Sequence, residues 1–498
     1  DTGYTHVEFH PVMEYLNEES KGYSTSAYYA PTRRFGSPAD FQKLVDDLHA
    51  ESVGVILDWT PAQFPRFDAG LEKFDGTALY EIPDPEHGVH PMWGTMLYNY
   101  ESPMVKDFLI SNACFWMDVY HVDGLRMDDV DAMLYLDFGR EAGKWIPNIY
   151  GSNENLHALE FLKHLNSILK KRNPGVLLIA QEDGLWPQLT DSVKNDHPGF
   201  DYKWSGGWTR DLLSYIETDP LSRKNHYDQL TLSMMYAYSE YYVLTLGMRD
   251  VGTLGDFLDR LPGSDREKAA QLREAYAYLT LHPGIKMTAP DREIPEDFRE
   301  YVRDLNEMYR EHPALFALDG EPEGFEWIQF TSYDENVVAF LRKTENPEET
   351  LLAVCNFSPV AYENYRVGVP FAGKYKEIFN SDSEKYGGRG MVNPRAKAAV
   401  HTECDDREYS LKLRLPAYGV TVFSCTLERK AEKKTPEKSG RRRKTEKKTA
   451  KSPSVKSSAA VRKTAEKAVG RAVAKVKETA VEKTSAVKAA VKEATGNK

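Results

Sequence analysis

The chain has few cysteines and no long apolar run. Its four cysteines, at positions 114, 355, 404 and 425, are scattered and lack the spacing of metal ligands. This pattern predicts a reduced, cytoplasmic protein. No apolar run is long enough to span a bilayer, so we expect no membrane association. No signal peptide is visible, although the chain begins at Asp1 rather than Met. Nothing in the sequence indicates a metal or an organic cofactor.

Positive charge is scarce in most of the chain and concentrated at its end. The 498 residues carry a net charge of -12, but residues 429–498 alone contain 23 Lys and Arg against 7 Asp and Glu. An acidic body with a net charge of -28 therefore carries a tail of +16. The tail lacks aromatic residues and cannot bury enough apolar area to fold alone, so the favoured interpretation is a solvated disordered extension. The alternative is a tail that binds a polyanion or an acidic partner through its charge.

Apolar segments in the remaining chain follow two different patterns. Up to residue 317, predicted strands alternate with predicted helices, which indicates a parallel α/β sheet or barrel. The strands are expected at residues 5–12, 52–59, 176–180 and 241–246, and the helices at 105–120, 153–171, 230–238 and 267–281. Residues 318–428 contain only short strands separated by turns, which is typical of an all-β sandwich. The sequence thus predicts three parts: 1–317, 318–428 and the tail.

One stretch, residues 121–130, places an arginine two positions before a carboxylate. Residues two apart on a strand share a face, so Arg126 and Asp128 would project together from the strand's C-terminal end. Barrel enzymes place their chemistry at that end. A neighbouring guanidinium keeps a carboxylate ionised, as a nucleophile requires. Taken alone, the stretch fits a structural ion pair better than a nucleophile, and both interpretations remain open.

Four motifs together resemble a known family. They are DWTPA at 58–62, FDGTALY at 74–80, DGLRMD at 123–128 and MLYLD at 133–137. The chain from about residue 3 to 427 is similar to glycogen (1,4-α-glucan) branching enzymes of the α-amylase superfamily of glycoside hydrolases. The resemblance implies a (β/α)8 TIM-type barrel followed by an all-β sandwich. The family's first β/α unit and its N-terminal β-domain have no counterpart, so we expect an excerpt or truncated product whose barrel lacks that unit.

The resemblance also implies a reaction and a set of site residues. The family cuts an α-1,4 glucan and transfers the cut segment to a 6-hydroxyl, by a retaining mechanism with two carboxylates. Asp128 matches the nucleophile and Arg126 the arginine that orients it. Tyr23 matches a tyrosine beneath the reacting sugar, and Asp58 matches the aspartate at the end of the third strand. The substrate would be an α-glucan such as glycogen or amylose.

Several family positions are altered here. Gln181 stands where the family has its general acid/base, and an amide cannot exchange that proton. Arg249 stands where the family has the aspartate that stabilises the transition state, and Met248 replaces the preceding histidine. Gln63 replaces a further histidine.

These substitutions leave three hypotheses. The first, which the substitutions favour, is a pseudoenzyme that binds α-glucan without branching it. The second is an active branching enzyme that uses a displaced carboxylate, Glu182 or Asp250, although both lie one residue from the expected position. The third is a scaffold that acts through the basic tail, and it is compatible with the first.

Overall fold

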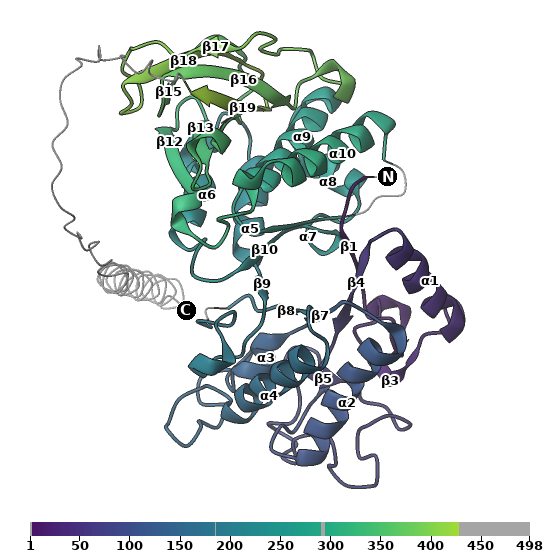
Figure 1. Cartoon of the computed structure of the whole chain (residues 1–498). Helices are drawn as coiled ribbons and strands as arrows, with labels where there is room; N and C mark the ends of the chain where they lie inside the picture. Colours follow the sequence, from purple (N-terminus) through teal and green to yellow (C-terminus); the bar gives the residue numbers. More distant parts are fainter. Residues whose placement is uncertain (1, 185, 290–293, 428–498) are drawn as a thin grey trace, which may run out of the picture. The chain divides into compact units, whose positions relative to one another are not determined.

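The computed structural model describes residues 2–184, 186–289 and 294–427, and the predicted tail at 429–498 lies outside them. Seven parallel strands form one sheet in the order β1-β4-β7-β8-β9-β10-β11 (Figure 1). Their bounds are His6–Phe9, Gly54–Trp59, Gly124–Met127, Leu177–Ala180, Tyr202–Trp204, Tyr242–Leu246 and Ile285–Thr288. This curled sheet has one strand fewer than a closed eight-stranded barrel, and no ladder between described residues joins β1 to β11. The predicted α/β fold is confirmed.

Helices follow most of the strands along the chain. They are α1 (Pro38–Ala50), α2 (Pro103–Tyr120), α4 (Leu156–Arg172), α5 (Gly206–Glu217), α9 (Asp265–Leu281) and α10 (Glu296–Glu311), together with the short helices α3 (Val130–Leu134), α6 (Asp228–Thr231), α7 (Met248–Val251) and α8 (Leu254–Arg260). Local sequence explains their ends. For example, Ser37 and Asp40 form a capping box before α1, with Pro38 at its first position. None of the helices in the described ranges is long and apolar enough to cross a membrane.

The core follows the two-residue period of the strands. Val55 and Leu57 of β4 point outward and pack with α2, whereas Ile56 points inward. Inside the sheet, Ile56 meets Ile179, Trp204 and Val243 in a separate small cluster. The inward face of each strand therefore leads from this apolar cluster to the polar residues at the strand's C-terminal end.

The C-terminal part is the predicted all-β domain. One sheet has the order β12-β13-β14-β19-β16-β17, and a second sheet pairs β15 with β18. Their bounds are Phe325–Ser332, Val337–Arg342, Leu351–Asn356, Gly419–Leu427, Gly373–Asn380, Lys397–Ala398, Tyr362–Val369 and Tyr409–Leu415. The sequence did not indicate β16. The first sheet packs on α9 (Figure 1). The rings of Tyr278 on α9 and Phe340 on β13 have centroids 6.3 Å apart.

One predicted helix, at residues 230–238, is wrong. The structure has α6 ending at Thr231 and a 3-10 turn at Leu232–Met235. Tertiary contacts override the helical pattern here: the Tyr227 hydroxyl donates to the Val337 carbonyl at 2.7 Å, and Ser233 bonds His282 at 3.0 Å. The strands β9 and β11 and the helices α5 and α10 were also not predicted.

Glu274 on α9 is a buried acid without a hydrogen-bond partner. Neither of its carboxyl oxygens finds one among the described residues, and the side chain is fully buried. Burial raises its pKa well above the usual range, although Arg223 opposes the shift. Arg223 itself donates to the carbonyl oxygen of Phe357 at 2.8 Å.

Replacing Glu274 with Met should therefore stabilise the protein. We expect Glu274→Met to raise the free energy of unfolding at pH 7 by about 1–3 kcal/mol, since it removes an unpaired buried polar group. A raised folded-state pKa costs stability as pH rises above the unfolded-state value, so the gain should shrink towards pH 4. Urea unfolding at both pH values measures this. Glu307→Met, at an exposed position on α10, is the control. A gain no larger than the control's would contradict the account.

Candidate active site

The polar residues at the C-terminal ends of β4 and β7 come together because the two strands are in register. Asp58 of β4 is directly opposite Arg126 of β7, and Glu8 of β1 is opposite Ile56 of β4. Asp128 lies two residues beyond Arg126, on the same face, and its N–H donates to the Trp59 carbonyl at 2.9 Å. The sheet thus gathers Glu8, Asp58, Arg126 and Asp128, as the sequence predicted for the last three.

Arg126 lies at the centre of this group and is completely buried. Its Nε donates to Asp58 Oδ1 at 2.7 Å and to Glu8 Oε1 at 3.0 Å. Its Nη1 donates to Asp128 Oδ1 at 3.1 Å, and its Nη2 donates to the Tyr23 hydroxyl at 3.0 Å and to Asp58 Oδ2. One guanidinium therefore orients side chains from four separate segments.

Glu8 and Asp58, which both accept from Arg126 Nε, differ in the direction of their pKa shifts. Burial favours the neutral form of both, and it raises the pKa of Glu8 well above the usual range, with the Asp58 charge adding to the shift. Burial acts on Asp58 too, but Arg126 and hydrogen bonds outweigh it and lower the pKa of Asp58. Burial therefore favours the protonated form more strongly in Glu8, whereas Arg126 favours the anion in Asp58.

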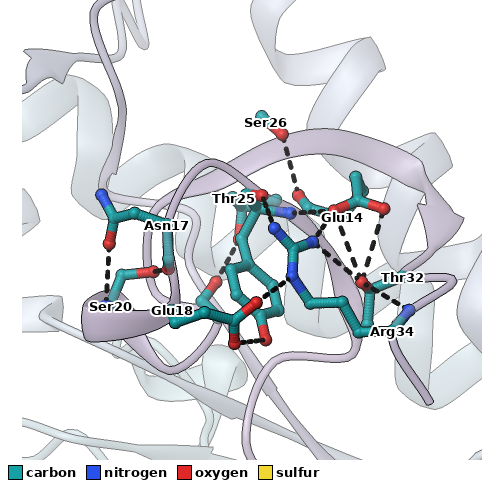
Figure 2. Close-up of polar contacts among 10 residues, drawn as sticks. Glu14, Asn17, Glu18, Ser20, Thr25, Ser26, Thr32 and Arg34 are labelled. Atoms are coloured by element: carbon teal, nitrogen blue, oxygen red, sulfur yellow. Dashed lines mark hydrogen bonds and ion pairs between the residues drawn. The ribbon is translucent and has the colours of Figure 1, made fainter.

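A polar network holds the hairpin that carries Tyr23. This hairpin joins β2 (Met13–Tyr15) to β3 (Thr25–Pro31). Figure 2 shows Arg34 between Glu14, Glu18 and Thr32: its Nε donates to Glu18 at 2.6 Å and its Nη1 to Thr32 at 3.1 Å and to Glu14. At the turn, Asn17 accepts the Ser20 N–H at 2.9 Å (Figure 2). These contacts place the Tyr23 hydroxyl where it donates to Asp58.

Arg249 brings a second guanidinium to Asp128. Its Nη1 donates to Asp128 Oδ1 at 2.7 Å, the same oxygen that Arg126 bonds. Its guanidinium carbon also lies 4.9 Å from the centre of the Tyr23 ring. Arg249 comes from α7, which follows β10, and Met248 beside it is exposed. The site therefore holds two cations beside Asp58 and Asp128.

Gln181 follows β8 and faces this group. Its side-chain Oε1 accepts the backbone N–H of Asp129 at 3.1 Å. Its backbone N–H donates to the Met127 carbonyl at 2.9 Å. Gln63, which begins β5 (Gln63–Phe64), donates to Asp129 Oδ2 at 3.1 Å. The two glutamines thus meet at Asp129, one at its backbone and one at its carboxylate.

The two carboxylates considered as replacements for Gln181 are both bonded elsewhere. Glu182 is buried and forms an ion pair with Lys203 of β9, which is also buried. Asp250 accepts the Gly247 N–H at 2.8 Å and so caps the first turn of α7. In the described parts of the chain, no hydrogen bond or ion pair joins either residue to Asp128.

The sequence did not single out Glu8, Lys203, or the acids Asp129 and Asp131. Burial raises the pKa of Asp129 to about 7, with the charge of Asp128 adding to it. Burial likewise raises the pKa of Asp131 to about 7, with Asp129 adding to it. The run of three acids within four positions, 128–131, was a signal for this cluster. Residue 129 also has a left-handed backbone, at φ 60°. We find no cluster of potential metal ligands among the described residues.

Comparison with known proteins gives the following relatives. Residues 327–426 match the family model for the C-terminal all-β domain of α-amylase. The 1,4-α-glucan branching enzyme of Rubrobacter xylanophilus is 43% identical over 443 residues, covering 84% of this chain and 61% of the relative. That of Marinobacter nauticus is 42% identical, covering 85% of this chain and 71% of the relative, and that of Aquifex aeolicus is 43% identical, covering 84% and 70%.

Solved structures show the same fold at low sequence identity. The α-amylase of Geobacillus thermoleovorans, complexed with acarbose, has a TM-score of 0.62 at 15% identity and covers 86% of this chain and 89% of its own. The pullulanase of Paenibacillus barengoltzii has a TM-score of 0.60 at 17% identity, covering 85% and 70%. Relative to the Rubrobacter and Myxococcus xanthus enzymes, the chain spans only 61% of the relative's length.

Breaking the buried Glu182–Lys203 pair from one side should destabilise the fold. Lys203→Met would leave the carboxylate buried without its cation, which costs about 3–5 kcal/mol. Thermal or urea unfolding measures the loss. The matched control is Lys203→Met with Glu182→Leu, which replaces both partners with apolar side chains and should recover most of the stability. Equal losses in the single and double variants would contradict the pairing.

The pKa of Asp129 predicts a slope of stability against pH. Its folded-state pKa of about 7 exceeds the unfolded value of about 3.9, so the folded protein binds more protons between them. Stability should therefore fall as pH rises from about 4 to 7. Asp129→Asn should make this decline shallower in urea unfolding. Asp68→Asn, at an exposed position, should leave it unchanged. An identical slope in both variants would refute the assignment.

Proposed function

The chain belongs to the 1,4-α-glucan branching enzyme family, and we propose that it acts in α-glucan metabolism, in the cytoplasm, as a glucan-binding homologue that has lost branching activity. The contacts of Asp128 support this most directly, because two guanidiniums donate to the same carboxylate oxygen, at 2.7 and 3.1 Å. A retaining transfer needs this carboxylate to attack the sugar. Two charge-assisted hydrogen bonds on one oxygen oppose that attack.

The carboxyl group that would transfer the proton in this reaction is also missing. A retaining enzyme places a second carboxyl about 5–5.5 Å from the nucleophile, to protonate the leaving oxygen. Gln181 stands at the sequence position that the family resemblance gives to this carboxyl, and its amide oxygen accepts the Asp129 N–H at 3.1 Å. The displaced carboxylate Glu182 is paired with Lys203, which argues against the alternative of an active enzyme that uses it.

Charge in the cleft opposes the transition state as well. An oxocarbenium-like transition state carries positive charge and is stabilised by nearby carboxylates. Arg126 and Arg249 both form ion pairs with Asp128, and Arg126 also pairs with Asp58. These two positive charges offset the negative charge that would favour a developing cation.

Glucan binding is supported by the parts of the site that remain. Tyr23, Asp58 and Arg126 are held in place by mutual hydrogen bonds. Trp93, about half exposed, stacks on His90 with centroids 4.2 Å apart and leaves a ring face of the kind that sugars pack against. The scaffold hypothesis for the basic tail stays a prediction, since residues 429–498 lie outside the described structure.

The decisive experiment is a branching assay on amylose, scored as new α-1,6 linkages. We expect the full chain and Asp128→Ala to be indistinguishable, while glucan still retards both on an affinity gel. The double variant Gln181→Glu/Arg249→Asp restores both altered groups, and an acid/base alone contributes about 10²–10⁴-fold in rate. It should therefore exceed the parent, and adding Asp128→Ala should abolish the gain. Activity in the parent that Asp128→Ala removes would overturn the proposal and favour a displaced acid/base.

A further inference from the structure

A small cavity lies where the N-terminal part of α9 meets the all-β domain, away from the cleft. Its volume is about 40 Å³, and its lining includes Arg266 and Arg273 from α9 and Arg389 from the loop after β16. At roughly 10–15 Å³ for each water, the space holds about three waters or one small oxyanion. Three arginines around one small cavity are unusual in a body with a net charge of -28.

Arg273 is buried without a counter-ion. Only 6% of its surface is exposed, and its Nε donates to the Ser381 carbonyl at 2.9 Å. Within the described ranges its side chain makes no other hydrogen bond and no ion pair. Burial lowers the pKa of Arg273. The charges of Tyr301, Asp382 and Asp297 oppose this shift, and the charge of Arg266 adds to it. Both features are those of a buried cation that an anion would stabilise.

The two acids that line the cavity are occupied by backbone groups. Asp382 accepts the Arg389 N–H on one oxygen, at 2.9 Å, and the Met391 N–H on the other, at 3.0 Å. Glu267 accepts the N–H and the hydroxyl of Ser264, at 2.9 and 2.7 Å, as the cap of α9. These carboxylates shape the loop and the helix end. Among the described residues neither forms an ion pair with the three arginines, although the charge of Arg389 adds to the hydrogen bonds from Ser264 that lower the pKa of Glu267.

Tyr418 adds a neutral donor to the lining. It is 4% exposed, and burial raises the pKa of its hydroxyl to about 12, so the hydroxyl keeps its proton. The first turn of α9 lies at the same cavity, and helix N-termini favour anions. Guanidiniums, a phenol and a helix N-terminus are all groups that donate hydrogen bonds to an oxyanion.

We propose that this cavity binds a phosphate-class oxyanion that bridges α9 and the all-β domain through Arg266, Arg273 and Arg389. Free inorganic phosphate and the phosphate monoester of a sugar or glucan present the same oxygens to this site. The site is independent of the proposed loss of branching activity, since none of its residues lies in the cleft.

The test is a titration of the full chain with inorganic phosphate at constant ionic strength, followed by calorimetry and by the unfolding temperature. The variant is Arg266→Gln/Arg389→Gln, because both side chains are exposed and their loss should not disturb the fold. Arg395→Gln, an exposed arginine of the same domain outside the cavity, is the matched control. All three proteins keep the basic tail, so phosphate binding by the tail cancels in the comparison.

We expect phosphate to raise the unfolding temperature of the parent and the control, and to bind the double variant at least tenfold more weakly. No binding to the parent, or equal binding to all three proteins, would overturn the proposal. Glucose 6-phosphate distinguishes the sources: tighter binding than phosphate identifies an ester as the ligand, and weaker binding identifies the free ion. None of these measurements depends on branching activity. The test of this proposal is therefore independent of the test of the proposed function.

Discussion

The buried guanidinium of Arg126 is the interaction on which the cleft depends. It bonds Glu8, Tyr23, Asp58 and Asp128, which come from β1, the β2–β3 hairpin, β4 and the end of β7. A charge removed from water at this depth is tolerable only when its partners surround it. The edge strand, the hairpin and the two inner strands therefore meet at one side chain, whose bonds add to the backbone ladders that pair β1 with β4 and β4 with β7.

The same dependence explains how Arg249 is accommodated. Asp128 already has one cation at 3.1 Å, and its remaining capacity as an acceptor takes the second at 2.7 Å. The Tyr23 ring, fixed by its bond to Asp58, provides a face for the incoming guanidinium. Arg249 thus fits between Asp128 and the Tyr23 ring, and it brings a second positive charge to the site.

Much of this arrangement could be predicted from the sequence, because strand periodicity and motifs are local. The shared face of Arg126 and Asp128 and the outward turn of Glu182 both follow from the two-residue period. The identity of Glu182's partner could not be predicted, since Lys203 belongs to a three-residue strand, too short to give a pattern. Glu8 was missed because nothing around an isolated acid within a strand shows that a guanidinium will reach it from position 126. The helix expected at 230–238 failed for a similar reason: distant partners decide its conformation.

The packing of α9 has a consequence for how this chain could be recombined. One apolar cluster includes Tyr278 of α9, Leu244 of the barrel sheet and Val422 of the all-β domain. The barrel part and the sandwich therefore share one apolar core and do not meet at a solvated interface. In a chimera that carried a relative's sandwich, the apolar side chains of that sandwich would not match those of α9. The unit that could be exchanged as a whole is the sandwich together with α9, although other segments separate the two along the chain.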